Sequence, residues 1–396
     1  MKEKFYVEVG SNQRNHFGEH ICGDVFLSKR IKEEGRLISV LADGMGHGVK
    51  ANVLGTLTAT LALGFSEEYK DPQTIGNIIM NTLPVCSERK ISYATFTIVD
   101  VDNGEVSILE YDNPLCLVMR GANILELDWE ELSLNTKNIL GETQEIKTCK
   151  FIPEKEDRII FISDGVTQSG MGSPELMLGW TRENYVEYVK EIISHDRNIS
   201  ASKLAQKIVN KAYANDNFKS KDDTSCGVIY FRNPRKIIIA TGPPFRKESD
   251  EEFAETVKSF DGKKILCGAT TTDIISREWG VSVDDNVEPT DPTLPPMSKM
   301  EGIDLVTEGI LTLNKVVNIL SNNTESTLNL GNGPADQIIR LLLDSDEIVI
   351  MVGTKINQAH HDPTLGVEVE IRRTTVKRLE DVLEKKFMKE VIVQYI

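Results

Sequence analysis

The sequence contains no long apolar run, no clustered cysteines and no excess of positive charge. No stretch approaches the roughly 18 consecutive apolar residues of a membrane-spanning helix. The first residues, Met1–Val9, alternate as a strand does rather than as a targeting segment. We therefore expect a cytoplasmic protein with no membrane partner. Asp and Glu outnumber Lys and Arg by 61 to 45, a net charge of −16 that repels phosphate backbones, so we expect no nucleic-acid partner.

Cysteine pairs at metal-binding or redox spacing are also missing. The six cysteines are scattered, with no Cys-x-x-Cys pair, at positions 22, 86, 116, 149, 226 and 267. This pattern favours reduced thiols that fill the core over disulfides or a zinc site.

At 396 residues the chain is longer than a single domain with one hydrophobic core usually is. A short polar break with a proline, Phe231–Arg235, separates two kinds of pattern. We therefore expect two domains, residues 1–232 and residues 236–396.

The first domain has strand patterns interrupted by a few helices. Three turn sequences between β-rich runs predict hairpins and hence antiparallel sheet: Asp102–Gly104, Asp112–Pro114 and Gly121–Asn123. Helices are predicted over Val49–Phe65, Glu183–Ile193 and Ala201–Ala214. The first is expected to bury its larger apolar residues, which recur at three- and four-residue steps: Val53, Leu54, Leu57, Leu61 and Phe65.

The second domain alternates short apolar strands with amphipathic helices, which predicts an α/β fold with a mostly parallel sheet. Strands are expected at Lys236–Ala240, Lys264–Cys267, Ile303–Val306, Glu347–Val352 and Val391–Tyr395. Several of them run into glycine and hydroxyl residues, as in Cys267–Thr272, and such turns share the carboxyl edge of a parallel sheet. A small ligand there and a plain scaffold or docking surface both remain open. His360-His361-Asp362 is expected to be a loop rather than a metal site.

Four aspartates of the first domain stand at the end of a strand or just before one. Asp43 and Asp164 each follow an apolar strand and precede a glycine, while Asp24 and Asp222 come just before strands. Gathered together, four carboxylates repel one another unless cations lie between them. Carboxylate, carbonyl and water oxygens are the ligands of Mg²⁺ and Mn²⁺. Two such ions sharing a water can direct it at phosphorus. Taken singly, each Asp-Gly is equally a common turn pair.

The motifs resemble a known family, the metal-dependent protein phosphatases of type 2C (PPM), in the bacterial branch typified by the stage II sporulation phosphatase E. Leu-Ala-Asp-Gly-Met-Gly-His-Gly at 41–48, Ser-Asp-Gly at 163–165 and Asp-Asp-Thr-Ser at 222–225 come in the family's order. The resemblance covers roughly residues 5–231. It implies two antiparallel sheets flanked by helices, and a serine/threonine phosphoprotein phosphatase in bacterial signalling that uses a hydroxide bridging two Mn²⁺ or Mg²⁺ ions.

The resemblance also implies roles for particular residues. Asp24, Asp43, Asp164 and Asp222 are the expected catalytic acids and metal ligands, together with the Gly44 carbonyl. Asp222 is preferred over Asp223, and His47 is assigned no catalytic role. Arg14 and Arg30 are candidate phosphate contacts only by their place in the sequence. The implied partner is a phosphoprotein of the anti-anti-sigma type. The alternative is a catalytically silent, phosphatase-like module that docks a phosphoprotein or a ligand.

Overall fold

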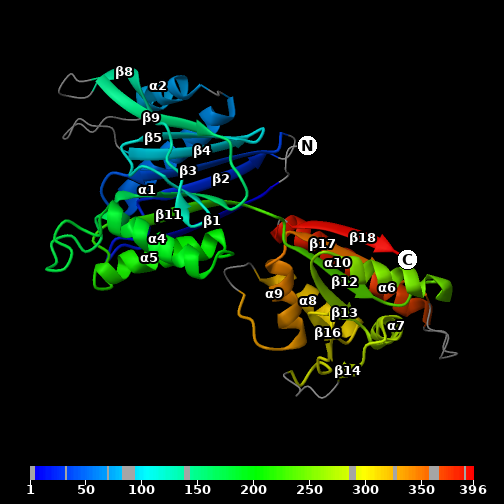
Figure 1. Ribbon diagram of the computed structural model, residues 1–396. Helices are drawn as coiled ribbons and strands as arrows, with labels where there is room; N and C mark the ends of the chain where they lie inside the picture. The colour runs from blue at the N-terminus through cyan, green and yellow to red at the C-terminus, as the bar shows by residue number, and fades with distance from the viewer. Residues whose placement is uncertain are drawn as a thin grey trace. The chain divides into compact units, whose positions relative to one another are not determined.

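The computed structural model describes residues 5–31, 34–68, 71–82, 94–137, 143–284, 291–323, 328–355, 365–387 and 389–396 (Figure 1). Cys86 and the segment His360-His361-Asp362 lie outside these ranges. Contacts divide the chain into two compact units, Met1–Asn233 and Pro234–Ile396. Within the described ranges, every helix is too short or too polar to span a membrane.

The first unit contains two antiparallel sheets. One has the strand order β2-β3-β4-β5-β9-β8 and the other β1-β11-β10-β6-β7. The strands of the first sheet are β2 (Val25–Ile31), β3 (Arg36–Gly44), β4 (Ala94–Asp102), β5 (Glu105–Tyr111), β8 (Glu130–Lys137) and β9 (Thr143–Phe151). Those of the second are β1 (Tyr6–Arg14), β6 (Leu117–Arg120), β7 (Asn123–Ile124), β10 (Asp157–Ile162) and β11 (Thr224–Arg232).

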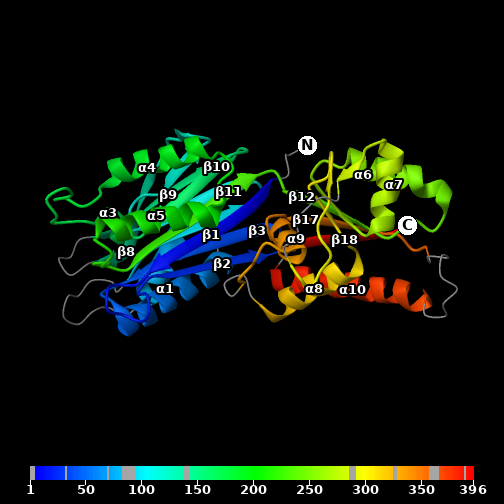
Figure 2. The same ribbon diagram turned by 90° about the horizontal axis from the view of Figure 1, so that it is seen from below.

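Helices cover the outer faces of both sheets. Helices α1 (Gly48–Glu68) and α2 (Pro72–Thr82) pack on the six-stranded sheet, and α4 (Arg182–His195) and α5 (Ala201–Asn215) on the five-stranded one. Figure 2 shows α4 and α5 on one side of the strands and α1 on the other. A third core of buried side chains from both sheets lies between them. The predicted sandwich of two antiparallel sheets flanked by helices is confirmed.

The expected buried face of α1 is only partly confirmed. Leu61 and Phe65 are half-buried and pack against the core, and Leu54 is half-buried. Val53 is 59% exposed and Leu57 40%, while the buried positions carry small residues: Gly48, Ala51, Gly55, Thr58, Ala59, Ala62 and Ser66. Small side chains let the helix backbone approach the sheet closely. A Cβ on Gly44 of β3 would lie 2.0 Å from the Ala51 carbonyl oxygen, so neither partner has room for bulk.

One of the three expected hairpins is also wrong. Asp102–Gly104 joins the paired strands β4 and β5, and Gly121 and Ala122 join the paired strands β6 and β7. Asp112–Pro114 instead follows β5 of one sheet and leads to β6 of the other. A proline-containing turn therefore carries the chain across the sandwich rather than back along the same sheet.

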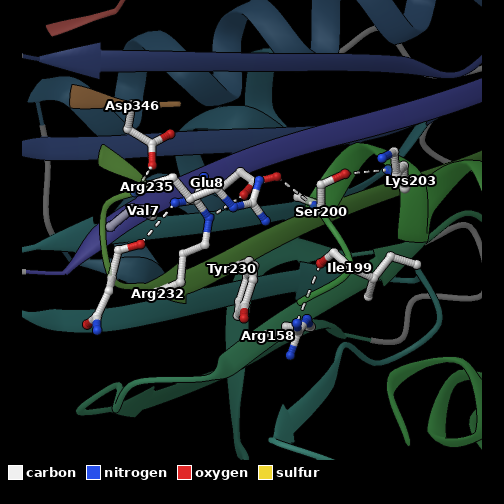
Figure 3. Close-up of polar contacts among 12 residues, drawn as sticks. Val7, Glu8, Arg158, Ile199, Ser200, Lys203, Tyr230, Arg232, Arg235 and Asp346 are labelled. Carbon is white, nitrogen blue, oxygen red and sulfur yellow. Dashed lines mark hydrogen bonds and ion pairs between the residues drawn. The ribbon is translucent and has the colours of Figure 1, made fainter. Parts of the chain in front are cut away.

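A carboxylate ties α5 to the five-stranded sheet. Glu8 of β1 accepts a 2.8 Å hydrogen bond from the Ala201 N–H at the start of α5, and pairs with Arg232 of β11. Figure 3 shows these contacts, with Arg158 beside the Tyr230 ring, whose centroid is 3.6 Å from the guanidinium carbon. Ser200 caps the same helix by accepting from the Lys203 N–H.

The second unit is built on a five-stranded sheet whose pairs are all parallel, in the order β16-β13-β12-β17-β18. Its strands are β12 (Lys236–Thr241), β13 (Lys263–Cys267), β16 (Leu305–Thr307), β17 (Glu347–Val352) and β18 (Glu390–Tyr395); β14 (Val283–Asp284) and β15 (Lys299–Met300) form a separate antiparallel pair. The predicted α/β fold with a parallel sheet is confirmed.

Helices cover both faces of this sheet. Helices α6 (Asp250–Ser259) and α7 (Ala269–Trp279) pack on one face and share a hydrophobic core with the sheet. The short 3₁₀ helix η1 (Lys247–Ser249) immediately precedes α6. Helices α8 (Ile310–Asn322), α9 (Pro334–Leu343) and α10 (Leu365–Phe387) share the other core. Figure 2 shows α6 and α7 opposite α8 and α10. Helix α7 begins at Ala269, so the Gly268-to-Thr272 segment is mostly the first turn of a helix.

Candidate metal centre

The four predicted aspartates are placed by the ends of neighbouring strands in both sheets. Asp43 is the penultimate residue of β3, and Asp24 immediately precedes β2, its antiparallel neighbour. Asp164 begins the short helix α3 (Asp164–Thr167) after β10, and Asp222 lies two residues before β11, which pairs with β10. Segments distant in sequence therefore meet at one end of the sandwich.

Glycine follows two of these aspartates because other backbone segments pass very close. A Cβ on Gly165 would lie 2.1 Å from the Asp223 carbonyl oxygen. Gly44 is restricted in the same way by the Ala51 carbonyl of α1. The glycines after Asp43 and Asp164 therefore allow α1 and the loop before β11 to pack closely against the acidic cluster. Neither Asp-Gly pair is simply a turn.

The four carboxylates interact electrostatically. Burial, followed by the negative charges of Asp24 and Asp164, raises the pKa of Asp43 to about 10. Burial raises the pKa of Asp24 to about 7, and burial with the charge of Asp164 raises the pKa of Asp222 to about 6. Burial likewise raises the pKa of Asp164. The raised pKa values mean that ionising all four carboxylates is unfavourable unless a positive charge lies among them.

Several of the carboxylate oxygens are buried without a hydrogen-bond donor from the described residues. This is true of both oxygens of Asp24 and of Oδ1 of Asp164, and Asp24 is only 2% exposed. The Ser225 and Ser163 side chains still lie close enough to Asp24 to lower its pKa, which offsets part of the effect of burial. Buried carboxylates without donors are costly. An all-oxygen donor set with unsatisfied lone pairs fits hard divalent cations such as Mg²⁺ and Mn²⁺.

The side chains are not arranged as a finished cation cage. Taken as they stand in the described part of the chain, no three His, Cys, Asp or Glu side chains form a group that could hold a metal ion. Asp43 nonetheless lies within hydrogen-bonding reach of Asp24 and of Asp164, and these contacts contribute to the pKa shifts of Asp43 and Asp164. These three carboxylates are therefore close together, although no three of the described side chains form a cation cage.

A cavity of about 820 Å³ opens beside the cluster. Asp43, Asp164 and Asp222 line it, whereas Asp24 and Gly44 do not. The sequence reasoning missed most of the other lining residues, which include His16, Glu110, Asp112, Lys147 and Lys221. Lys221 could have been inferred from the sequence, because it directly precedes Asp222. Glu110 and Lys147 are brought to the cavity by the pairing of β5 with β9, which the sequence pattern does not reveal.

Asp222 and Asp223 lie in different surroundings. Asp222 is partly exposed and lines the cavity. Asp223 is 2% exposed, and its Oδ1 accepts a 3.0 Å hydrogen bond from the His16 N–H, which ties it to the loop that precedes β2. Its Oδ2 is buried without a hydrogen-bond donor among the described residues, and its charge adds to those that raise the pKa of Asp24.

His47 lies at the mouth of the same cavity. Its Nδ1 is 2.8 Å from Glu19 Oε1, and its ring stacks on His16 with centroids 4.3 Å apart. Neither arginine considered from the sequence lines the cavity. Arg14 lies over the Tyr213 ring, and Arg30 donates to the Val7 carbonyl. The lysine and arginine side chains that line the cavity, among the described residues, are instead Lys147 and Lys221.

Comparison with known proteins identifies the family. A sequence model of the stage II sporulation protein E (SpoIIE) family matches residues 33–232, just over half of the chain. The chain belongs to this family, which confirms the resemblance seen in the sequence motifs. No curated protein sequence matches the chain.

Similar solved structures are distant in sequence. The SpoIIE phosphatase domain from Bacillus subtilis is 16% identical, with 59% of this chain and 95% of that one covered and a TM-score of 0.43. RsbX in complex with magnesium is 18% identical, covering 58% and 98%, with a TM-score of 0.39. The Mycobacterium tuberculosis serine/threonine phosphatase PstP/Ppp is 12% identical, covering 57% and 99%, with a TM-score of 0.39. Likenesses this distant carry no functional conclusion by themselves.

Proposed function

We propose that the protein is a metal-dependent serine/threonine phosphoprotein phosphatase that acts in bacterial signalling in the cytoplasm. The observation that carries the proposal is the convergence of four aspartates from both sheets on one buried cluster beside an 820 Å³ cavity. A binding module has no need of such a repulsive cluster. Membership of the stage II sporulation protein E family supports the same conclusion.

Asp24, Asp43, Asp164 and Asp222 would hold two divalent cations, with the Gly44 carbonyl as a further ligand. Binding requires the carboxylates to turn toward a common point, because they do not form a cage as they stand. The chemistry that bound divalent cations supply in such a site is activation of water for attack at phosphorus. The chain's own contribution is to exclude bulk water from Asp24 and to hold the aspartates on rigid strand ends.

The cavity suits a phosphorylated side chain carried by a protein partner. Its volume of about 820 Å³ exceeds that of a phosphorylated side chain, and Lys147 and Lys221 line it together with three of the aspartates. Positive side chains there would orient a dianionic phosphate ester through charge attraction. We assign as substrate class a phosphoserine or phosphothreonine protein, of the anti-anti-sigma type that the sequence resemblance implies.

The test is hydrolysis of a phosphoserine peptide by the full chain with Mn²⁺ or Mg²⁺, with EDTA, and after substitution of one aspartate. Asp164→Asn should lower kcat/KM about a hundredfold or more, as loss of one group that supports transition-state charge does. EDTA should abolish turnover, and added Mn²⁺ should restore it.

Asp112→Asn is the matched control. Asp112 lines the same cavity and loses the same charge on substitution, but it is not one of the four clustered acids, and its φ of 57° suits asparagine. Its activity should remain within a few-fold of the wild-type value. Turnover that survives EDTA would overturn the metal mechanism. A folded chain that binds a phosphopeptide without turnover under any divalent ion would establish the docking module instead.

A further inference from the structure

A second cavity, of about 170 Å³, opens at the carboxyl edge of the parallel sheet in the second unit. The connections lead from β12 to β13 and β16 on one side of the sheet and from β17 to β18 on the other, so the order of connection reverses between the adjacent parallel strands β12 and β17. Ligands of open α/β sheets bind at such reversals, outside the carboxyl ends of the strands. The cavity is lined from the loops after four of the strands, by Gly242, Gly268, Gly309 and Lys355 among others.

Two helices begin at this cavity, and the N-cap residue of each is a glycine, which has no side chain to cap the helix. The Gly309 N–H, just before α8, donates a 3.3 Å hydrogen bond to Glu308 Oε2. Helix α7 starts after Gly268 and α8 after Gly309, and neither has an acidic residue in its first turn. The first N–H groups of a helix have no acceptor inside the helix, and its dipole is positive at this end. Gly268 has a φ of 118°, which only glycine adopts without strain, and its missing side chain keeps the start of α7 open to the cavity.

A buried hydroxyl without a partner also lines the cavity. Thr271, in the first turn of α7, is fully buried, and its Oγ1 has no hydrogen-bond partner among the described residues. Oγ1 lies 3.6 Å from the position that a Cβ on Gly268 would take, so it faces the loop that lines the cavity. Burying a hydroxyl without a partner is unfavourable. A ligand oxygen in the cavity would supply the missing acceptor.

The charged side chains that line the cavity in the described part of the chain are positive. They are Arg372 and Lys355, and none of the described Asp or Glu residues lines it. Arg372 Nη1 donates a 3.1 Å hydrogen bond to the Gly353 carbonyl, which holds the guanidinium over the turn after β12. The adjacent acidic residue, Glu308, is exposed and outside the lining.

We propose that this cavity binds a phosphate group, either inorganic phosphate or the phosphoryl group of a small ester. Two helix N-termini, two basic side chains and an unsatisfied hydroxyl converge there, which is the donor set of an anion site. At roughly 30 Å³ per water molecule, the volume holds about five or six waters, enough for one phosphate and too little for a whole nucleotide. This site is separate from the aspartate cluster and does not depend on the proposed phosphatase activity.

The test is calorimetric titration of the full chain with sodium phosphate in EDTA at constant ionic strength, with sodium chloride as the blank. EDTA keeps divalent cations, and hence phosphate, away from the aspartate cluster. We expect saturable binding of one phosphate per chain. Thr271→Val, which replaces the hydroxyl with a methyl group, should weaken it about tenfold or more, the loss expected for a hydrogen bond to a charged group.

Thr312→Val is the matched control. Thr312 is also a fully buried helical threonine whose Oγ1 has no partner in the described chain, but it does not line the cavity. Both variants should raise the melting temperature without phosphate, since each removes an unsatisfied hydroxyl. Only Thr271→Val should lose the further rise caused by phosphate.

Two results would overturn the proposal: no saturable binding to the wild-type chain, or equal weakening by both variants. Glycerol phosphate forms a second arm of the titration. If it binds tenfold more tightly than inorganic phosphate and loses this affinity in Thr271→Val, the group recognised is the phosphoryl group of an ester. If inorganic phosphate binds as well or better, the free ion is the ligand.

Discussion

Glu110 is a buried acid whose local setting makes protein stability depend on pH. It lies in β5 at 2% exposure, and its Oε1 accepts a 2.7 Å hydrogen bond from the Cys116 N–H. Burial raises its pKa from 4.5 to about 7, although the hydrogen bonds from Cys116 partly offset the effect. The folded chain therefore holds a proton on Glu110 in a pH range where the unfolded chain has lost it.

Glu110 should make the folded state less stable as pH rises from about 4.5 to about 7. Because the folded-state pKa lies above the unfolded one, the stabilisation is complete below pH 4.5 and is lost above pH 7. Glu110→Gln, which keeps an acceptor for Cys116, should remove this dependence. The variant should gain on the order of 2–3 kcal/mol relative to wild type between pH 5 and pH 8 in urea unfolding. A difference that stays constant across this range would contradict the assigned pKa.

Local sequence signals identified the aspartates but not their surroundings. The Asp-Gly pairs at 43–44 and 164–165 are visible because each follows an apolar strand. Glu110 and Lys147 gave no such signal, because they reach the cavity only through the pairing of β5 with β9. The reason for Gly165, a carbonyl 2.1 Å from its absent Cβ, is a long-range contact and is equally invisible in sequence.

At the scale of elements, helix α1 shows how packing overrides hydrophobic periodicity. The larger apolar residues predicted a buried stripe, but the helix approaches the sheet through alanine, glycine and threonine. Val53 is left 59% exposed, while Ala59 is fully buried against the sheet. Periodicity identified the helix correctly but could not choose between an apolar stripe and a small-residue stripe.

Hydrophobicity alone predicts that replacing a valine of α1 with a polar residue lowers the free energy of unfolding and that enlarging an alanine does not. We expect the reverse for Val53 and Ala59. Val53→Gln should change the free energy of unfolding by no more than about 0.5 kcal/mol. Ala59→Leu should destabilise by about 1–3 kcal/mol, because the added side chain has no room against the sheet. Chemical denaturation of both variants measures the difference. A larger cost for Val53→Gln than for Ala59→Leu would mean that α1 packs by its other face.

Helix α5 depends on a carboxylate from β1. Glu8→Gln should destabilise the chain by about 2 kcal/mol, since it removes the negative charge that pairs with Arg232, whose side chain is only 7% exposed. Glu187→Gln is the control, because Glu187 forms an exposed pair with Lys190 on the neighbouring helix α4. That variant should cost no more than about 0.5 kcal/mol. Equal losses of unfolding free energy in the two variants, measured by urea unfolding, would show that the Glu8 contacts stabilise the fold no more than an exposed ion pair does.

For the whole molecule, the change of pattern near Pro234 falls where contacts divide the chain into two units, between Asn233 and Pro234. The fold class predicted on each side is confirmed. Alternation of strand and helix requires parallel crossovers, so the second unit followed directly from the order of its elements. The first unit was harder, because a turn such as Asp112–Pro114 does not reveal whether the next strand pairs locally or joins the opposite sheet. The motif resemblance implied two sheets but did not show which turn crosses between them, and periodicity did not show it either.

The central claim is that the clustered aspartates of the first unit exist to hold divalent cations. Equilibrium titration of the full chain with Mn²⁺, counting bound ions per chain, tests it most directly. We predict two ions for the wild-type chain, and a loss of at least one of them, or about tenfold or more in affinity, in Asp43→Asn. Binding of fewer than one ion per wild-type chain, or binding that Asp43→Asn leaves unchanged, would contradict the account.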